Sequence, residues 1–292
     1  EKRVELHCHT KMSDMDAVTD VTTLLKQAHD WGHPAMAVTD HGVVQAFTDA
    51  NHYIESLDKD DPFKVIYGVE GYLVDDLQDV AVNEKGQSLK GTYVVFDLET
   101  TGFSSVKDKI IEIGAVKVEN GEITDKYSTF VNPKIPIPFR ITQLTSITDE
   151  MVMESPEIET ILPQFLKFVG DAVLVAHNAS FDVSFIEENC RQQGIEPDFT
   201  SVDTVGLARV LLPTLSKFKL NVVAKALNIS QEHHHRAVDD ARVTAEIYVK
   251  FIQMLEERGI ETLDQMNHFG AHNAEAIRKM PSYHVIVLAK ND

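Results

Sequence analysis

Apolar runs that end in acidic residues or histidines recur along the chain, and the clearest of them lies at residues 94–102. There the run Val-Val-Phe leads into Asp97 and Glu99, with a single leucine between them. Such a run predicts a buried strand. Successive side chains of a strand point to opposite faces, so Asp97 and Glu99 share one face with their oxygens close together. Two like charges held that close need a cation between them, and the alternative is a solvated acidic end of a strand.

Short apolar runs alternate with stretches of helical periodicity in the first 90 residues. The predicted strands cover residues 4–10, 35–38 and 64–67, and the predicted helices cover residues 18–31 and 45–57. This order implies parallel strands joined by right-handed crossovers, as in a β/α barrel. Barrels of this kind place their chemistry just beyond the C-terminal ends of the strands.

Residues that commonly bind metals follow each of these three strands, namely His7, His9, Asp16, His41 and Glu70. A lone histidine at a strand end is more often structural, but this succession favours a metal site. The motifs that hold these residues, His-Cys-His-Thr, Ser-x-x-Asp, Thr-Asp-His-Gly and Gly-x-Glu, resemble the PHP (polymerase and histidinol phosphatase) domain of bacterial replicative polymerases. The resemblance implies a site for Zn²⁺ or Mn²⁺. The family's later ligands, including a final Asp-x-His pair, have no counterpart in this sequence, so we expect an incomplete barrel that binds metal weakly and has no phosphoesterase activity.

A second α/β pattern covers the middle of the chain. The predicted strands after residues 94–102 are 110–118, 126–131 and 173–176, and a helix is predicted at 157–169. An Asn-Gly pair between the first two of these strands predicts a hairpin turn, which makes the sheet antiparallel there. Asp182 lies one or two turns into the helix after the last strand, so its carboxylate emerges beside the end of that strand. Asp203 follows another short apolar run and is predicted to cap a helix or support the site.

Three consecutive histidines, His233 to His235, precede a long predicted helix. Either His234 acts with Asp239, or His235 acts with Asp240. The apolar face of the helix decides between them, because Asp240 flanks this face and Asp239 points away from it. Only a carboxylate at the edge of the core can converge with residues of a sheet. We therefore predict that His235 lies in the preceding loop and Asp240 on the helix, with His233 in a surface loop.

Four carboxylates and one imidazole are therefore predicted to form one site. Asp97, Glu99, Asp182 and Asp240 bind two divalent cations, and His235 accepts a proton from the attacking water in a hydrolysis. Oxygen ligands favour Mg²⁺ or Mn²⁺ over Zn²⁺. The motifs Phe-Asp-x-Glu-Thr-Thr-Gly, His-Asn-x-x-Phe-Asp and His-x-Ala-x-x-Asp-Ala resemble those of the DEDDh family of 3′→5′ exonucleases. The resemblance implies a ribonuclease H-like fold, an α/β fold whose five-stranded mixed sheet is flanked by helices.

The same resemblance implies contacts with the terminal nucleotide of a DNA 3′ end, single-stranded or frayed. The residues concerned are Thr101, Gly102, Leu144, His177, Asn178 and Phe181. Thr101 and Gly102 are expected near the sugar and base, and Leu144 and Phe181 against bases. Three lysines, Lys217, Lys219 and Lys225, form the most basic patch of the chain. They either track the phosphates of the strand or lie on a solvated helix face.

A last apolar strand at residues 281–289 follows a polar stretch and contains His284, a further candidate ligand. It resembles the strand that continues a polymerase PHP domain, which makes the exonuclease an insertion within that domain. This arrangement resembles the PolC-type alpha subunits of bacterial replicative DNA polymerase III, and it implies a fragment without the polymerase active site. The predicted domains are residues 1–90 for the first part of the PHP domain, 91–258 for the exonuclease and 259–292 for the return into the PHP domain.

Composition adds limits to this interpretation. The formal net charge of -19 argues against a protein that binds polyanions over its whole surface, but cations at an acidic site can still hold nucleic acid. Two cysteines in no metal or disulfide pattern fit a reducing cytoplasm. No apolar run is long enough for a membrane span, and the first residue is not Met, which suggests an excised piece of a longer chain. The predicted partners are therefore the DNA 3′ end, the rest of a polymerase chain and the replisome, and no membrane.

Other functions fit the same motifs. An RNA-trimming 3′→5′ exoribonuclease of the same superfamily would share every catalytic residue, and the flanking PHP pieces argue against it. A PHP-type metal-dependent phosphoesterase is opposed by the missing ligands. A binding module with dead sites would have lost one of the five catalytic residues, and none is substituted.

Overall fold

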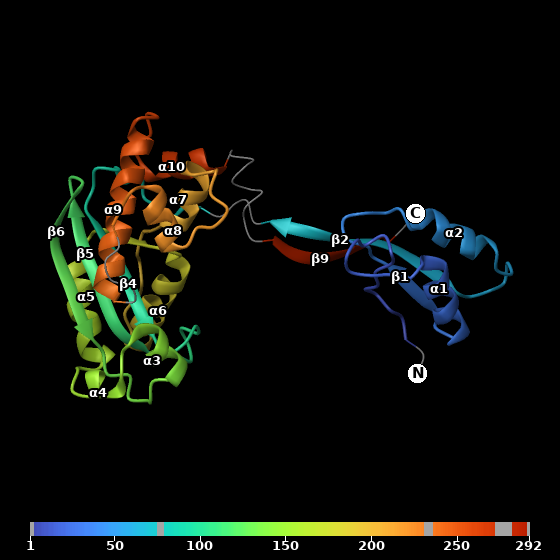
Figure 1. Cartoon of the computed structure of the whole chain (residues 1–292), viewed down its shortest axis with the longest axis horizontal. Coiled ribbons are helices and arrows are strands. Elements are labelled where there is room, and N and C mark those ends of the chain that lie inside the picture. Colours follow the sequence, from blue (N-terminus) through green and yellow to red (C-terminus); the bar gives the residue numbers. More distant parts are fainter. Residues whose placement is uncertain (1–2, 75–78, 231–235, 272–281, 291–292) are drawn as a thin grey trace. The chain divides into compact units, whose positions relative to one another are not determined.

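The computed structural model describes residues 3–74, 79–230, 236–271 and 282–290, and it divides the chain into two compact units. The split unit comprises residues 1–76 and 280–292, and the inserted unit comprises residues 77–279 (Figure 1). No helix in the described stretches combines the length and the apolar character that crossing a membrane requires.

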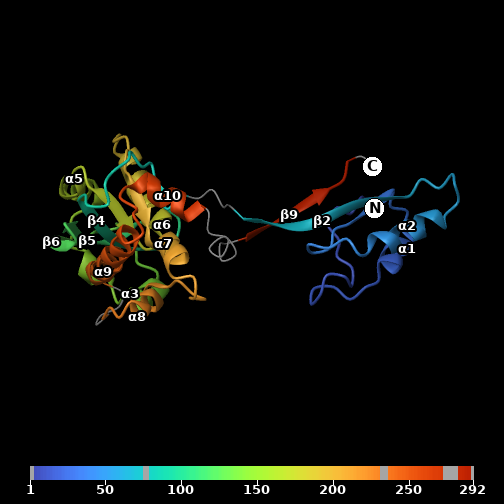
Figure 2. The ribbon, with the colours of Figure 1, turned by 90° about the horizontal axis from the view of Figure 1, so that it is seen from above.

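The split unit is a small α/β layer. Its elements are α1 (Val21–Asp30), β1 (Ala35–Val38), α2 (Phe47–Glu55), β2 (Lys64–Val74) and β9 (Ser282–Leu288). The sheet order is β1-β2-β9, with β1 parallel to β2 and β9 antiparallel to it. Figure 2 shows β9 alongside β2. The helices α1 and α2 pack against each other and against β1 and β2, and these contacts form the core of the split unit.

The first predicted strand of the split unit, residues 4–10, forms only one β-bridge, between Glu5 and β1. The carbonyl of Cys8 accepts the N–H of Thr39 at 2.9 Å, as in a ladder. The N–H of Cys8, however, donates to the hydroxyl of Thr39 at 2.9 Å. This bond replaces a main-chain ladder bond, so the predicted strand is interrupted.

Strand β2 is longer than the strand predicted at residues 64–67, because its second half pairs with β9. The register runs from Gly68 opposite Leu288 to Val74 opposite Ser282. The returning strand is therefore antiparallel, whereas β1 and β2 show the parallel pairing predicted for this part of the chain.

The inserted unit contains a mixed sheet of six strands in the order β3-β8-β7-β4-β5-β6. Their bounds are β3 (Ala81–Val82), β4 (Tyr93–Thr100), β5 (Ile110–Glu119), β6 (Glu122–Phe130), β7 (Val173–Ala176) and β8 (Ser201–Asp203). Strands β4, β5 and β6 are antiparallel, β7 and β8 continue parallel to β4, and β3 is antiparallel to β8. The four strands predicted by range and the short apolar run before Asp203 are all present, as β4 to β8. The sixth strand, β3, comes from residues assigned to the preceding domain.

Helices cover both faces of this sheet. They are α3 (Phe139–Thr145), α4 (Asp149–Val152), α5 (Ile158–Val169), α6 (Ala179–Gln192), α7 (Thr204–Leu211), α8 (Leu220–Ala226), α9 (Ala237–Glu256) and α10 (Leu263–Ala271). Residues of α5 and α6 form one core cluster with the sheet, and residues of α7, α8, α9 and α10 form another.

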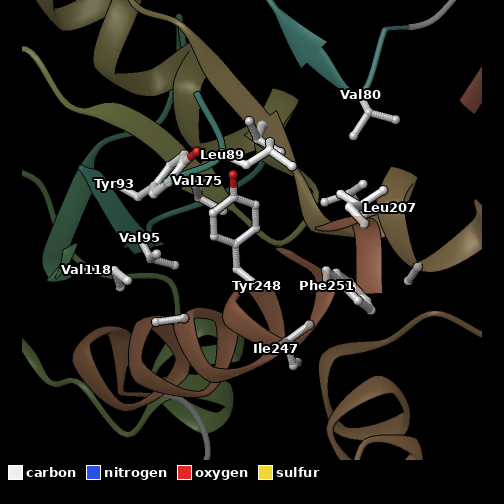
Figure 3. Packing of buried hydrophobic residues seen from close by; sticks show 14 of the residues in the cluster. Val80, Leu89, Tyr93, Val95, Val118, Val175, Leu207, Ile247, Tyr248 and Phe251 are labelled. Carbon is white, nitrogen blue, oxygen red and sulfur yellow. The ribbon is translucent and has the colours of Figure 1, made fainter. Parts of the chain in front are cut away.

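Alternation along β4 decides which side chains face which helices. Tyr93 and Val95 belong to the cluster that contains Tyr248 and Phe251 of α9 (Figure 3), whereas Phe96 belongs to the cluster with α5 and α6. Because side chains two residues apart share a face, the two acidic residues that follow along β4 point to the α9 side.

Segments on both sides of the predicted exonuclease domain complete the inserted unit. The Asn267 side chain exchanges two hydrogen bonds of 2.8 Å with the main chain of Ala81. Leu89, before β4, and Leu263, in α10, are buried in the core cluster that contains α9. The compact unit therefore extends beyond residues 91–258 at both ends.

Candidate metal centres

Strand β4 presents Asp97 and Glu99 at its C-terminal end, where Asp240 in the first turn of α9 meets them. One ligand oxygen from each of these three carboxylates lies within 4.8 Å of the other two. Asp239 was the alternative to Asp240 in the sequence. Among the described residues it takes no part in this group, and it is half-exposed.

Asp182, in the first turn of α6, approaches the same end of β4. It is 3% exposed, and its Oδ1 accepts the N–H of Leu98 at 3.1 Å. Asp97 and Asp182 are close enough that their charges influence each other. Asp97, Glu99, Asp182 and Asp240 are called the carboxylate cluster below.

Asp203 fixes the start of the helix that carries Asp182. Its Oδ1 accepts the N–H groups of Asn178 at 2.9 Å and Ala179 at 3.2 Å, where the chain turns from β7 into α6. Asn178 has a left-handed φ of 73°, a conformation that asparagine tolerates better than most residues. The same Asp203 carboxylate caps α7, as predicted, by accepting two N–H groups of its first turn.

Burial and repulsion raise pKa values in the carboxylate cluster. Loss of hydration, followed by the charges of Asp182, Glu99 and Asp240, holds the pKa of Asp97 well above its usual range. Burial raises the pKa of Glu99 to about 7, and Glu112 and Asp240 add to the effect. Burial is also the main cause that raises the pKa of Asp182 to about 8. Carboxylates that resist ionisation near neutral pH are suited to exchanging their protons for a divalent cation, so this donor set fits a metal site.

Glu112 was not among the predicted site residues, yet it lies directly beside the cluster. It stands opposite Glu99 in the β4–β5 ladder, is 1% exposed, and pairs with Arg236 at 2.9 Å. A glutamate within the apolar run that begins β5 was the signal in the sequence, because a charge is rarely buried without a partner.

The predicted general base, His235, lies outside the described residues, as do His233 and His234. Helix α9 begins at Ala237, and the extended residue before it is Arg236. The assignment of His235 therefore stays a prediction.

Six residues of the split unit converge in a second group, the histidine cluster: His7, His9, Asp16, His41, Glu70 and His284. The centre of the cluster is Glu70, which is 1% exposed. Its Oε2 lies 2.6 Å from Nε2 of both His7 and His9, and its other oxygen bonds His284. Nε2 of His41 lies 3.3 Å from Oδ2 of Asp16, and its Nδ1 lies 3.6 Å from Oε1 of Glu70.

The histidine cluster pairs carboxylates with imidazoles. Burial alone would raise the pKa of Glu70, but hydrogen bonds with His7, His9 and His284 lower it to about 2. Burial lowers the pKa of His9, and its bonds with Glu70 and Asp16 outweigh that effect and raise it. The mixture of imidazole and carboxylate ligands fits a divalent transition-metal ion.

A family model described as Exonuclease matches residues 94–248, which run from β4 into α9 and contain the whole carboxylate cluster. The match covers more than half of the chain. The chain belongs to this exonuclease family. A second family model, described as PHP domain, matches residues 5–134. The first part of that match lies in the split unit and the remainder in the inserted unit.

Curated relatives match the chain over its full length. It is 54% identical over 292 residues to the DNA polymerase III PolC-type of Clostridium perfringens, covering 100% of this chain and 20% of that protein. It is 48% identical over 291 residues to the protein of the same name from Caldanaerobacter subterraneus subsp. tengcongensis, again covering 100% of this chain and 20% of the relative. The chain thus spans about a fifth of the length of these relatives.

A solved structure, E. coli Exonuclease I in complex with a dT13 oligonucleotide, matches with a TM-score of 0.53 and 14% sequence identity. The match covers 58% of this chain and 42% of that one. This likeness, together with the mixed sheet and its flanking helices, confirms the predicted ribonuclease H-like fold.

The residues expected near the terminal nucleotide of an exonuclease differ in accessibility. Leu144 is 52% exposed and Asn178 is also exposed, while Phe181 is half-buried. The Phe181 ring lies edge-on to the exposed Phe103, with 6.3 Å between ring centroids. Phe103 was not predicted, although an apolar residue directly after a Thr-Thr-Gly turn was a signal in the sequence.

The three other residues predicted to contact the nucleotide make close contacts within the inserted unit. The hydroxyl of buried Thr101 accepts the N–H of Lys109 at 2.9 Å. A Cβ on Gly102 would overlap the carboxylate of Asp108, which closes the same turn. Both ring nitrogens of His177 bond within the inserted unit, to a hydroxyl at 2.9 Å and a main-chain carbonyl at 2.8 Å.

Proposed function

We propose that the inserted unit is a divalent-metal-dependent exonuclease that removes nucleotides from the 3′ end of DNA and proofreads for a PolC-type replicative polymerase. The observation that carries this proposal is the convergence of Asp97, Glu99 and Asp240 within 4.8 Å at one end of a sheet, with Asp182 beside them. The match to an exonuclease family over the same residues supports it.

The carboxylate cluster would hold two ions of Mg²⁺ or Mn²⁺, because all of its donors are oxygens. Bound ions of this kind polarise a phosphoryl oxygen and stabilise both the attacking and the leaving oxygen. The chain's own residues orient this chemistry. Pairing with β5 at both positions fixes Asp97 and Glu99, and the first turns of α6 and α9 deliver Asp182 and Asp240. His235 is proposed as the group that accepts the proton of the attacking water.

The substrate is proposed to be a single-stranded or frayed DNA 3′ end. The names of the full-length relatives and the dT13 complex of the structural neighbour support this choice over RNA. Exposed Leu144, Asn178 and the edge of Phe181 are proposed to contact the terminal nucleotide. The rest of a polymerase chain and the cytoplasmic replisome are the proposed partners.

For the split unit we propose a site for Zn²⁺ or Mn²⁺ at the histidine cluster. The convergence of Glu70 with five other candidate ligands supports it. We propose that this 292-residue chain, which spans about a fifth of its relatives, binds metal weakly at this site and hydrolyses no phosphoester.

The proposal is tested with 5′-labelled DNA and RNA of one sequence, each with a paired or mismatched 3′ terminus, in Mg²⁺ or Mn²⁺. Metal-dependent shortening of DNA from the 3′ end, faster at the mismatch, is expected. Preference for RNA would instead support an RNA-trimming enzyme. His235→Ala should lower the rate by roughly 10²- to 10⁴-fold and His234→Ala far less; the reverse order would move the base to His234 and its partner to Asp239.

A further inference from the structure

The start of α9 packs on β5 through a contact that the periodic pattern of the sequence does not predict. Glu112, near the start of β5, and Arg236, just before α9, form an ion pair in which two guanidinium nitrogens contact the carboxylate. Arg236 Nη2 lies 2.9 Å and Nε 3.2 Å from Oε1 of Glu112. The other oxygen of Glu112 accepts the N–H of Ala237 at 3.3 Å, one of the N–H groups that a helix leaves unpaired at its start. One buried carboxylate therefore binds both the side chain before α9 and the main chain of its first residue.

The same face of β5 leaves space for the helix main chain. A Cβ on Gly114, two residues after Glu112, would lie 2.0 Å from the nitrogen of Val238 and 2.1 Å from the carbonyl carbon of Ala237. No side chain fits at that distance, so only glycine allows this approach. Glu112 and Gly114 together make a seat for the first turn of α9.

This seat lies on the strand next to two of the metal-site carboxylates. In the β4–β5 ladder Glu112 stands opposite Glu99, and Gly114 stands opposite Asp97. Side chains directly opposite each other share one face of a sheet. The position of the seat is thus fixed to that of Asp97 and Glu99 by main-chain pairing.

The connection to Asp240 is equally direct. The carbonyl of Arg236 accepts the N–H of Asp240 at 3.0 Å, which is the first helical turn of α9. A shift of Arg236 would therefore move Asp240 relative to the β4 carboxylates. We propose that Glu112 is a positioning residue, which sets the place of Asp240 in the carboxylate cluster through Arg236 and the first turn of α9. This inference rests on the proposed metal-dependent function of the same cluster.

The ion pair also keeps a guanidinium from competing with the cation. Arg236 is 43% exposed and lies near the Glu99 carboxylate, whose charge it already influences. Without Glu112, the guanidinium would turn to Glu99 and neutralise a metal ligand. Removing both partners should then be less harmful than removing Glu112 alone, because the double variant no longer carries the competing guanidinium.

The test compares the complete 292-residue chain with Glu112→Gln, Arg236→Gln and the double variant, using Arg191→Gln as the control. Arg191 forms ion pairs with glutamates on the surface of α6, so its loss removes an Arg–Glu pair without touching the seat. The readouts are the melting temperature, Mn²⁺ affinity by calorimetry, and kcat and KM for DNA over a range of Mn²⁺ concentrations.

Glu112→Gln is expected to lower Mn²⁺ affinity and kcat by about 10- to 100-fold, as loss of a residue that orients a metal ligand commonly does. KM for DNA should stay within about twofold of the parent at saturating metal. The double variant should recover part of the lost Mn²⁺ affinity and kcat. Gly114→Ala should reproduce the loss of Mn²⁺ affinity, because it displaces the same helical turn.

The inference is overturned if folded Glu112→Gln binds Mn²⁺ and cleaves DNA as the parent does. Should Glu112→Gln not fold, parent-like Mn²⁺ affinity in folded Arg236→Gln would overturn it equally. A parent that binds Mn²⁺ but leaves DNA intact would instead refute the proposed exonuclease function, and the Mn²⁺ titrations would still decide the role of Glu112.

Discussion

The carboxylate cluster and the histidine cluster are both suited to divalent cations, yet their electrostatics without metal are opposite. In the carboxylate cluster burial and repulsion raise the pKa of Asp182 to about 8 and that of Glu99 to about 7. In the histidine cluster hydrogen bonds with imidazoles lower the pKa of Glu70 to about 2. The first arrangement opposes its own ionisation, whereas the second supplies internal counter-charges. A cation should therefore stabilise the fold of the inserted unit far more than that of the split unit.

The strongest test of this contrast removes one carboxylate. Asp97→Asn should lose at least ~10³-fold in exonuclease rate, because metal-ion and electrostatic contributions commonly supply several kcal/mol. Its metal-free fold should be more stable than the parent's, since one repelling charge is gone. Rate assays and thermal melts in chelator measure the two effects. Asp239→Asn is the matched control, because Asp239 is a neighbouring acid outside the group. A variant that keeps the parent rate would remove Asp97 from the site.

Trimming the chain tests whether the inserted unit is self-sufficient. Residues 77–279 should fold and degrade DNA, whereas residues 90–258 should not fold cooperatively. The shorter piece lacks buried Leu89, Leu263 and Met266. Loss of each such side chain costs about 2–5 kcal/mol, against a total stability of about 5–15 kcal/mol for a typical protein. Circular dichroism melts of the two pieces decide the matter, and a sharp transition in residues 90–258 would contradict the extended boundary.

His9→Ala tests the other side of the comparison. His9 contacts both Glu70 and Asp16, so its removal should lower the affinity of the split unit for Zn²⁺ or Mn²⁺ by about 10- to 100-fold. His52→Ala is the control, because His52 is an exposed residue of α2 outside the cluster. Elemental analysis after dialysis and calorimetric titration provide the measurements. Equal metal content in the parent and His9→Ala would show that the cluster is not the binding site.

The smallest effect concerns pH. In chelator, the raised pKa values of Asp97, Glu99 and Asp182 mean that the folded inserted unit binds more protons than the unfolded chain between about pH 5 and 8, so its stability should fall as pH rises through that range. Glu70 acts oppositely, because its lowered pKa adds stability that is lost as pH falls from about 4.5 to 2.

The two responses can be separated optically. The chain has one tryptophan, Trp31, which follows α1 in the split unit, so its fluorescence reports that unit alone. Circular dichroism reports both units. Saturating Mg²⁺ should abolish the loss of stability that the inserted unit shows as pH rises through neutral. A loss of stability that persists with metal would refute the assignment of this pH response to the carboxylate cluster.

Periodicity was enough to predict the elements that carry the carboxylates. The two-residue repeat of β4 placed Asp97 and Glu99 on one face, and the helical phase of α9 placed Asp240, rather than Asp239, toward the sheet. Contacts without a repeat were not predictable. Strand β3 has only two residues and carries no pattern, so the boundary at residue 91 missed it.

The contact between Glu112 and Arg236 joins residues 124 positions apart. Nothing in either local pattern specifies it, and only the buried charge within β5 pointed to a missing partner. In the split unit, the prediction of a strand at residues 4–10 was wrong because the Thr39 hydroxyl accepts the N–H of Cys8. A hydrophobic pattern does not show such competition for a main-chain donor.

The pairing of Val74 with Ser282 has a consequence for the order of events during synthesis. These two residues stand opposite each other, so the whole inserted unit occupies the place of a hairpin turn between β2 and β9. The ribosome releases β9, with His284, only after every residue of the inserted unit has emerged, and domains generally fold as units in the order of synthesis. The carboxylate cluster is therefore assembled on a nascent chain whose histidine cluster still lacks a member.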